Sequence, residues 1–427
     1  MKNFFYTILL VLIAVSVFAQ TSVHRVLILN EGYFDYFTNE IITPVTVAAY
    51  YPETEIYEML NEVSDARFAS DIKISGDVYF VAADKFLLKY DLFTDELLAS
   101  IEVQGIRKIA VDENYIVVTR GEYLVSLDSY IQVYDRNTLE FVFEIPSDEL
   151  NYTTEGVLIH EGIAYVAVNN GFNFGSEVGM IAQVDLAAQQ MIETIDLGPE
   201  AINPDNIMFD GETIFTLNNK DYTGSSVSAY KLGTTELSTQ NLLNISAGCG
   251  TSVYFNGNIY YQELFGTSVT KYEPFTSDII GVKEFETSFY ALAFDEIHDL
   301  LYTSETDYFS YGKIHVYDLS GNELKNFDAG VSPGNFVFDV RTATGILDVQ
   351  NFEINIYPNP TSDFMNIKAE DYMQAFRISD IHGKIIIEVT DIAAKELQLD
   401  LQGYAPGNYF VTIATGESIT TQLISKL

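Results

Sequence analysis

The chain has 427 residues, of which 22 are Lys or Arg and 61 are Asp or Glu, so its formal net charge at pH 7 is −39. This charge repels polyanions and therefore excludes nucleic acid and anionic lipid surfaces as partners. The single cysteine, Cys249, which we interpret as a small buried residue, excludes an intrachain disulfide; the 48% of residues that are apolar must supply the stability instead.

Residues 1–19 have the pattern of a secretory signal peptide. Lys2 supplies the positively charged n-region, and an apolar run from Phe4 to Phe18 follows it. The residues directly before Gln20 have the small-residue pattern of a cleavage site. This run is shorter than the ~20 residues that a membrane-spanning helix needs, and no later stretch is long and apolar enough, so we expect no transmembrane segment. No cysteine follows the cleavage point directly, which argues against a lipid anchor.

Residues 25–339 repeat one unit seven times: a strand that often ends in Tyr and an acidic residue, a tight turn, and another strand. The anchor positions are Tyr50, Tyr90, Tyr134, Val184, Tyr230, Tyr272 and Tyr317. By subtraction, the intervals run from 40 (90 − 50) to 50 (184 − 134). This period and the strand alternation predict an all-β fold, a seven-bladed β-propeller over residues 20–340, with the anchor tyrosines packed between blades.

The seventh unit is divided between the two ends of this region. Strands expected at 25–30, 43–50 and 55–60 lack an innermost partner, whereas a lone strand at 335–339 follows the last complete unit. Pairing that strand with the N-terminal three would close the ring and remove an exposed sheet edge.

An acidic residue follows the anchor directly in five units, and Thr stands four positions after the anchor in five units. Both residue types accept hydrogen bonds from nearby backbone N–H groups. We therefore interpret the Tyr-Asp-x-x-Thr pattern as turn chemistry between the third and fourth strands of a blade, not as catalysis.

These units resemble those of the YncE-like class of seven-bladed propellers, in which a similar strand is followed by Asp-x-x-Thr-Gly, although the Gly is missing from most units here. The opening segment 26–32 (VLILNEG) is similar to the start of a Bacteroidota surface-propeller family whose members include the cobalamin-capturing lipoprotein BtuG. This resemblance implies a cell-surface protein and a corrinoid ligand.

After a linker at 341–350, the pattern changes over residues 351–427. The segments 356–361 (IYPNPT), 378–387 around His382, and 401–413 resemble, in order and spacing, the C-terminal sorting domain of the type IX secretion system. We expect a small antiparallel β-sandwich. The resemblance implies contact with that secretion machinery and export across the outer membrane, with the tail usually removed and the body left at the cell surface or in the extracellular space.

None of the five histidines stands in a paired metal-ligand spacing, and the chain has no G-x-S-x-G elbow and no phosphate-binding Gly-rich loop between a strand and a helix. The sequence therefore predicts no catalytic residue, no metal and no cofactor. We expect a protein that is not an enzyme.

The loops carry the best candidates for binding. In a propeller, the loops from second to third strands and the blade-to-blade connections emerge on one face, and here these segments are long and aromatic. The candidate ligand-binding residues are Tyr33, Phe34, Tyr36, Phe37, Arg67, Arg107, Tyr123, Asn170, Phe172, Phe174, Lys220, Tyr222, Phe265, Tyr308 and Tyr311. Exposed aromatic clusters rimmed by polar side chains mark interaction surfaces, although such aromatics can also pack beneath their own loops.

These observations favour capture of a small or medium-sized ligand on this face, with a corrinoid as the ligand that the resemblance implies. A surface scaffold or adhesion module that binds protein or polysaccharide is the alternative. A propeller lyase or hydrolase acting on an extracellular polymer would require charged side chains that converge near the channel.

Overall fold

The computed structural model describes residues 21–248, 251–342, 354–380, 384–414 and 419–427. The expected signal peptide, Cys249, most of the expected linker and His382 lie outside these ranges. Within them every regular element is a β-strand, and no helix is long and apolar enough to cross a membrane. The chain forms two compact units: one is Ser22–Arg341, and the other contains Thr342–Leu427.

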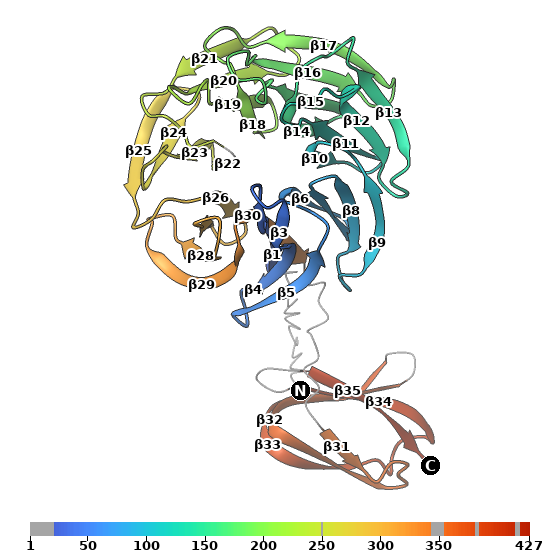
Figure 1. Ribbon diagram of the computed structural model, residues 1–427. Helices are drawn as coiled ribbons and strands as arrows, with labels where there is room; N and C mark the ends of the chain where they lie inside the picture. Colours follow the sequence, from blue (N-terminus) through green and yellow to red (C-terminus); the bar gives the residue numbers. More distant parts are fainter. Residues whose placement is uncertain (1–20, 249–250, 343–353, 381–383, 415–418) are drawn as a thin grey trace, which may run out of the picture. The chain divides into compact units, whose positions relative to one another are not determined.

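The first unit is a seven-bladed propeller of four-stranded antiparallel sheets, in which the first strand of each blade lies innermost (Figure 1). Blade 1 consists of β30 (Pro333–Thr342), β1 (Thr21–Asn30), β4 (Val45–Tyr51) and β5 (Ile56–Val63). Blade 2 consists of β6 (Ala69–Ser75), β7 (Val78–Ala83), β8 (Phe86–Asp91) and β9 (Leu97–Glu102). Blade 3 consists of β10 (Ile106–Val111), β11 (Tyr115–Arg120), β12 (Ser129–Asp135) and β13 (Phe141–Pro146). Blade 4 consists of β14 (Thr154–His160), β15 (Ile163–Val168), β16 (Met180–Asp185) and β17 (Gln190–Asp196).

The remaining blades follow in chain order. Blade 5 consists of β18 (Pro204–Phe209), β19 (Thr213–Asn218), β20 (Ser226–Lys231) and β21 (Leu237–Asn241). Blade 6 consists of β22 (Ser252–Phe255), β23 (Asn258–Gln262), β24 (Ser268–Glu273) and β25 (Asp278–Glu284). Blade 7 consists of β26 (Ala291–Asp295), β27 (Leu300–Glu305), β28 (Tyr311–Tyr317) and β29 (Glu323–Val331). A two-stranded hairpin, β2 (Tyr33–Asp35) and β3 (Glu40–Thr43), extends the connection from β1 to β4.

Blade 1 closes the ring as predicted. β30, from the end of the unit, is hydrogen-bonded to β1, from its start, in the strand order β30-β1-β4-β5. The anchor tyrosines are buried, and Tyr50 of blade 1 stacks on Phe327 of blade 7 at a centroid distance of 4.1 Å. Contacts of this kind between neighbouring blades continue the core around the ring.

The predicted turn chemistry is present between third and fourth strands. Asp91 Oδ1 accepts hydrogen bonds from the backbone N–H groups of Phe93 and Thr94, both at 2.8 Å. The next residue, Asp95, has φ +58°, and the register of β8 against β9 shifts beside the turn. The position where the YncE-like pattern has Gly therefore still adopts a left-handed backbone, which a non-glycine residue occupies here.

The C-terminal unit is built from β31 (Ile354–Tyr357), β32 (Phe364–Asp380), β33 (Ile385–Asp400), β34 (Gly407–Ala414) and β35 (Ile419–Lys426). β32 is long enough to pair with β31 through its first half and with β34 through its second half, while β33 runs along its other edge. As expected, this unit is a small antiparallel β domain: its strands are joined by hydrogen bonds, with register shifts along β32 and β33, around a single apolar cluster. Asn359, in the segment 356–361, bonds the backbone of Leu423 and Ser425 in β35.

Candidate functional site

The loop face is formed by the connections between second and third strands. The first of these, residues 31–44, contains the β2–β3 hairpin, whose turn is held by Asp35: its Oδ1 accepts bonds from the N–H groups of Phe37 and Thr38. The other connections of five residues or more lie at 121–128 in blade 3, 169–179 in blade 4, 219–225 in blade 5, 263–267 in blade 6 and 306–310 in blade 7. All carry predicted site residues.

The structure places most of the predicted aromatic residues in contact with solvent. The exposed ones are Tyr36, Phe37, Tyr123, Phe174, Tyr222, Phe265, Tyr308 and Tyr311. Tyr33, Phe34 and Phe172 are partly buried. Phe37 and Phe265 are fully exposed, at 102% and 99%, so neither packs beneath its loop.

Several of these rings meet in pairs near junctions between blades. Tyr33 of the hairpin packs edge-on against Phe309 of blade 7 at 5.1 Å, while Phe34 packs edge-on against Tyr36 at 4.8 Å. A second pair, Tyr123 of blade 3 and Phe174 of blade 4, lies 6.1 Å apart. Some of the predicted aromatic residues thus gather at the junction of blades 7 and 1 and at the junction of blades 3 and 4, whereas Tyr222 and Phe265 lie on the loops of blades 5 and 6.

Two predicted basic residues are engaged by carboxylates. Arg67 Nε lies 2.9 Å from Asp84 Oδ2, and its Nη2 reaches Glu122 Oε1 at 3.4 Å; the bond to Asp84 raises the pKa of Arg67. Arg107 makes a two-point contact with Glu155, each N···O distance being 2.9 Å. The sequence does not reveal these pairings, because the carboxylate partners stand 17 and 48 positions away in the chain.

The other two polar candidates also serve the loops themselves. Lys220 Nζ bonds Glu200 Oε2 at 2.7 Å and Asn241 Oδ1 at 2.6 Å. The amide of Asn170 is buried and donates to the carbonyl of Ser176, which shapes the 169–179 loop. These side chains therefore position the loops on which the exposed aromatic rings are carried.

A cavity of about 610 Å³ opens between the β2–β3 hairpin and the loops of blades 2 and 3. Its lining residues are Phe34, Asn39, Ile41, Asp65, Arg67, Asp84, Lys85, Glu102, Gln104, Gly105 and Glu122. Four carboxylates against two basic side chains give the lining a formal charge of −2 (4 acidic, 2 basic). Of the predicted site residues, only Phe34 and Arg67 line it.

Glu31 is a further residue of this face that sequence reasoning missed. Its Oε2 accepts a hydrogen bond from the hydroxyl of Tyr290, at 2.9 Å. Burial raises the pKa of Glu31 to about 7, against the opposing effects of Tyr290, Lys108 and Arg107. The only available signal was its place in the segment 26–32, which carried the family resemblance.

The histidines of the described ranges lie apart from this face or pair locally. His298 Nδ1 lies 2.6 Å from Asp295 Oδ2 in the turn between β26 and β27, and His315 Nδ1 lies 2.9 Å from Glu323 Oε1. Among the residues that the structure describes, no group of three or more His, Cys, Asp or Glu side chains is arranged to hold a metal ion.

The fold and the tail together define the class: a secreted seven-bladed β-propeller with a C-terminal sorting domain. Residues 355–426 match the family described as the secretion system C-terminal sorting domain. This domain directs export across the outer membrane to the cell surface or the extracellular space, and it requires interaction with the secretion machinery. No curated protein matches the chain.

Solved structures share the propeller fold. A hypothetical selenium-binding protein from Sulfolobus tokodaii is 12% identical, with a TM-score of 0.55, over 75% of this chain and 94% of that one. The dihydro-heme d1 dehydrogenase NirN, in complex with DHE, is 11% identical, with a TM-score of 0.51, over 89% of this chain and 76% of that one. At such identities the likeness concerns the fold alone.

Proposed function

We propose that this protein is a non-enzymatic binding protein of the cell exterior that captures a small or medium-sized ligand in the cavity beside the β2–β3 hairpin. The observation that carries the proposal is the cavity itself: about 610 Å³, with Phe34 and Ile41 as apolar wall and Gln104, Asp65 and carboxylates of blades 2 and 3 as polar wall. Pockets with an apolar body and a few convergent polar groups are typical ligand sites.

The lining restricts the chemistry of the ligand. Its net negative charge and the pairing of Arg67 with Asp84 disfavour a ligand that carries carboxylates. Carboxylate and amide oxygens instead accept hydrogen bonds from N–H and O–H donors, and Phe34 offers a face for a flat apolar surface. A corrinoid, with a flat ring bordered by primary amides, has this character, and the resemblance of segment 26–32 to the Bacteroidota surface-propeller family points to the same ligand.

A surface scaffold or adhesion module is the second candidate. It is favoured by Phe37 and Phe265, whose side chains are fully exposed and lie outside the cavity lining. Exposed aromatic rings of this kind suit contact with a polysaccharide or a protein surface.

Calorimetric titration of the full chain with cyanocobalamin, cobinamide and a neutral oligosaccharide tests the first candidate. We expect binding of a corrinoid with a Kd below about 10 μM, and a loss of at least about tenfold in the variant Phe34→Ala. Phe265→Ala is the matched control, because it removes an equally large ring away from the cavity. Absence of heat with all three probes would overturn the proposal, and recovery of a surface polymer that depends on Phe265 would favour the scaffold.

A further inference from the structure

The segment Asn30-Glu31-Gly32 is hydrogen-bonded to the end of β29 in blade 7 and to the residue that connects β29 to β30. The N–H of Glu31 donates to Ser332 O at 2.9 Å, and the N–H of Gly32 donates to Val331 O at 3.0 Å. Gly32 has φ +75°, and a Cβ there would lie 2.4 Å from Thr43 O, so the backbone admits only glycine at this position. The direction of the Glu31 side chain is therefore fixed by the ring closure.

The carboxylate of Glu31 lies across Gly334 in β30, the innermost strand of blade 1. A Cβ at position 334 would come within 2.0 Å of Glu31 Oε1, so glycine makes room for the carboxylate. The side chain keeps part of its surface exposed even though it is surrounded by protein, as expected for a group near the axis of a propeller. One oxygen, Oε2, accepts from Tyr290, which precedes β26.

Aromatic rings connect this carboxylate to the loop face. Tyr290 packs edge-on against Tyr308 at 5.3 Å, and Tyr308 is 55% exposed. On the side of β10, Phe172 lies over the guanidinium of Arg107 at 5.2 Å. Glu31 is thus connected through Tyr290 to Tyr308, an exposed ring of the predicted binding face.

Three charged or titratable groups lower the pKa of Glu31: Tyr290, Lys108 and Arg107. Arg107 is itself paired with Glu155 of β14. Burial outweighs these partners and raises the pKa of Glu31 to about 7. A glutamine would accept the same bond from Tyr290 without any cost of ionisation. A carboxylate that is unfavourable for the empty protein at neutral pH points to a role in binding.

We propose that Glu31 is a ligand-contacting carboxylate near the propeller axis, which accepts a hydrogen bond from an O–H or amide N–H donor of the captured ligand, while Tyr308, which packs against Tyr290, borders that part of the ligand. This inference rests on the proposed function and adds to the cavity a second contact point for the same ligand. It assigns to the ligand a neutral, donor-bearing edge rather than an anionic one.

The proposal predicts that binding is linked to the ionisation of Glu31. The hydrogen-bond donor of the ligand binds the ionised form of Glu31. Because the pKa of Glu31 is about 7, its ionised fraction rises about tenfold between pH 6 and pH 8. The affinity of the ligand should therefore rise about tenfold over the same range. Glu31→Gln should remove this pH dependence and weaken binding at pH 8 by about tenfold.

The test is titration of the full chain with cyanocobalamin, cobinamide and the neutral oligosaccharide at pH 6, 7 and 8, for the parent and for Glu31→Gln. Glu144→Gln is the matched control: it deletes the same charge on the outer strand β13, where Glu144 bonds Gln132. Circular dichroism and thermal unfolding check that the variants are folded. If the parent binds a probe but Glu31→Gln binds it equally well, with the same pH profile, the role of Glu31 is refuted and the proposed function stands. If the parent binds none of the probes, the proposed function fails and this inference fails with it.

Discussion

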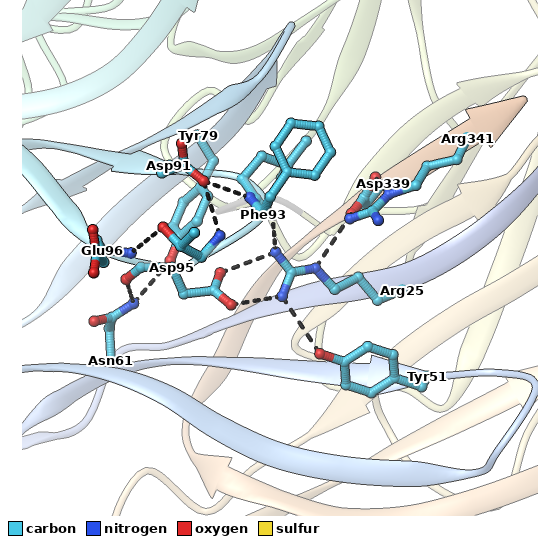
Figure 2. A network of polar contacts seen from close by, with 12 residues as sticks. Arg25, Tyr51, Asn61, Tyr79, Asp91, Phe93, Asp95, Glu96, Asp339 and Arg341 are labelled. Carbon is cyan, nitrogen blue, oxygen red and sulfur yellow. Dashed lines mark hydrogen bonds and ion pairs between the residues drawn. The ribbon is translucent and has the colours of Figure 1, made fainter. Parts of the chain in front are cut away.

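Arg25 ties the split blade to its neighbour, and its removal should loosen the ring. From β1 its guanidinium makes two bonds of 2.9 Å to the two carboxylate oxygens of Asp95, in the turn between β8 and β9 of blade 2 (Figure 2). It also donates to Leu92 O and, through Nε at 3.3 Å, to Asp339 of β30. The side chains of Arg25 and Asp339 are 3% and 2% exposed, so these ion pairs are shielded from water.

Removing one member of a buried ion pair costs about 3–5 kcal/mol, because the partner is left buried and uncompensated. For Arg25→Met we expect the lower part of this range, since Asp339 keeps its bond to Arg341 at 2.6 Å. The propeller unit, Ser22–Arg341, has 320 residues (341 − 22 + 1). With an unfolding entropy of about 2.1 cal/mol/K per residue, a loss of about 3–4 kcal/mol lowers its Tm by about 4–6 °C.

Calorimetry of the full chain measures the Tm of the propeller transition, and hydrogen exchange of β30 amides reports whether the ring opens at this blade. Lys313→Ala is the control, because the pair of Lys313 with Asp328 is wide, at 4.0 Å, and exposed; its loss should change Tm by less than about 1 °C. An unchanged Tm together with unchanged exchange in β30 for Arg25→Met would refute the reasoning.

Three further predictions follow from single residues. The folded-state pKa of Glu31 lies above its ordinary value of 4.5, so its contribution to stability is present below pH 4.5 and is lost as the pH rises through about 7. Between pH 4.5 and pH 8 the free energy of unfolding of Glu31→Gln, measured with urea, should therefore rise by about 2–3 kcal/mol relative to that of the parent. A difference between the two proteins that stays constant over this pH range would contradict the prediction. Gly32→Ala should cost more than about 2 kcal/mol in the same assay, since the new Cβ meets Thr43 O in a left-handed backbone, whereas Gly175→Ala, in open space at φ +82°, should cost only about 1 kcal/mol. Asp135→Ala removes three exposed turn bonds and should cost about 1 kcal/mol; a loss above about 3 kcal/mol would show that the turn does more than cap a hairpin.

The architecture was predictable because it depends on local and periodic features of the chain. The spacing of the seven anchor positions gives the number of blades, and the acidic residues after them hold turns only a few positions long, as Asp91 does. The divided blade could be anticipated as well, because a repeat that begins without its innermost strand requires one from the other end. The sorting domain was recognisable from three short segments in a fixed order.

The site was only partly predictable, because its chemistry depends on pairs far apart in the chain. The sequence indicated an aromatic face, and the exposed rings of Phe37 and Tyr308 lie on loops of that face. Only the tertiary structure pairs Arg107 with Glu155, 48 positions away, and brings Tyr290 to Glu31 across 259 positions. The packing of blade 3 on blade 4 creates the first contact and the closing of the ring creates the second. The desolvation that raises the pKa of Glu31 comes with this assembly, since burial is a property of the assembled blades and not of any segment alone.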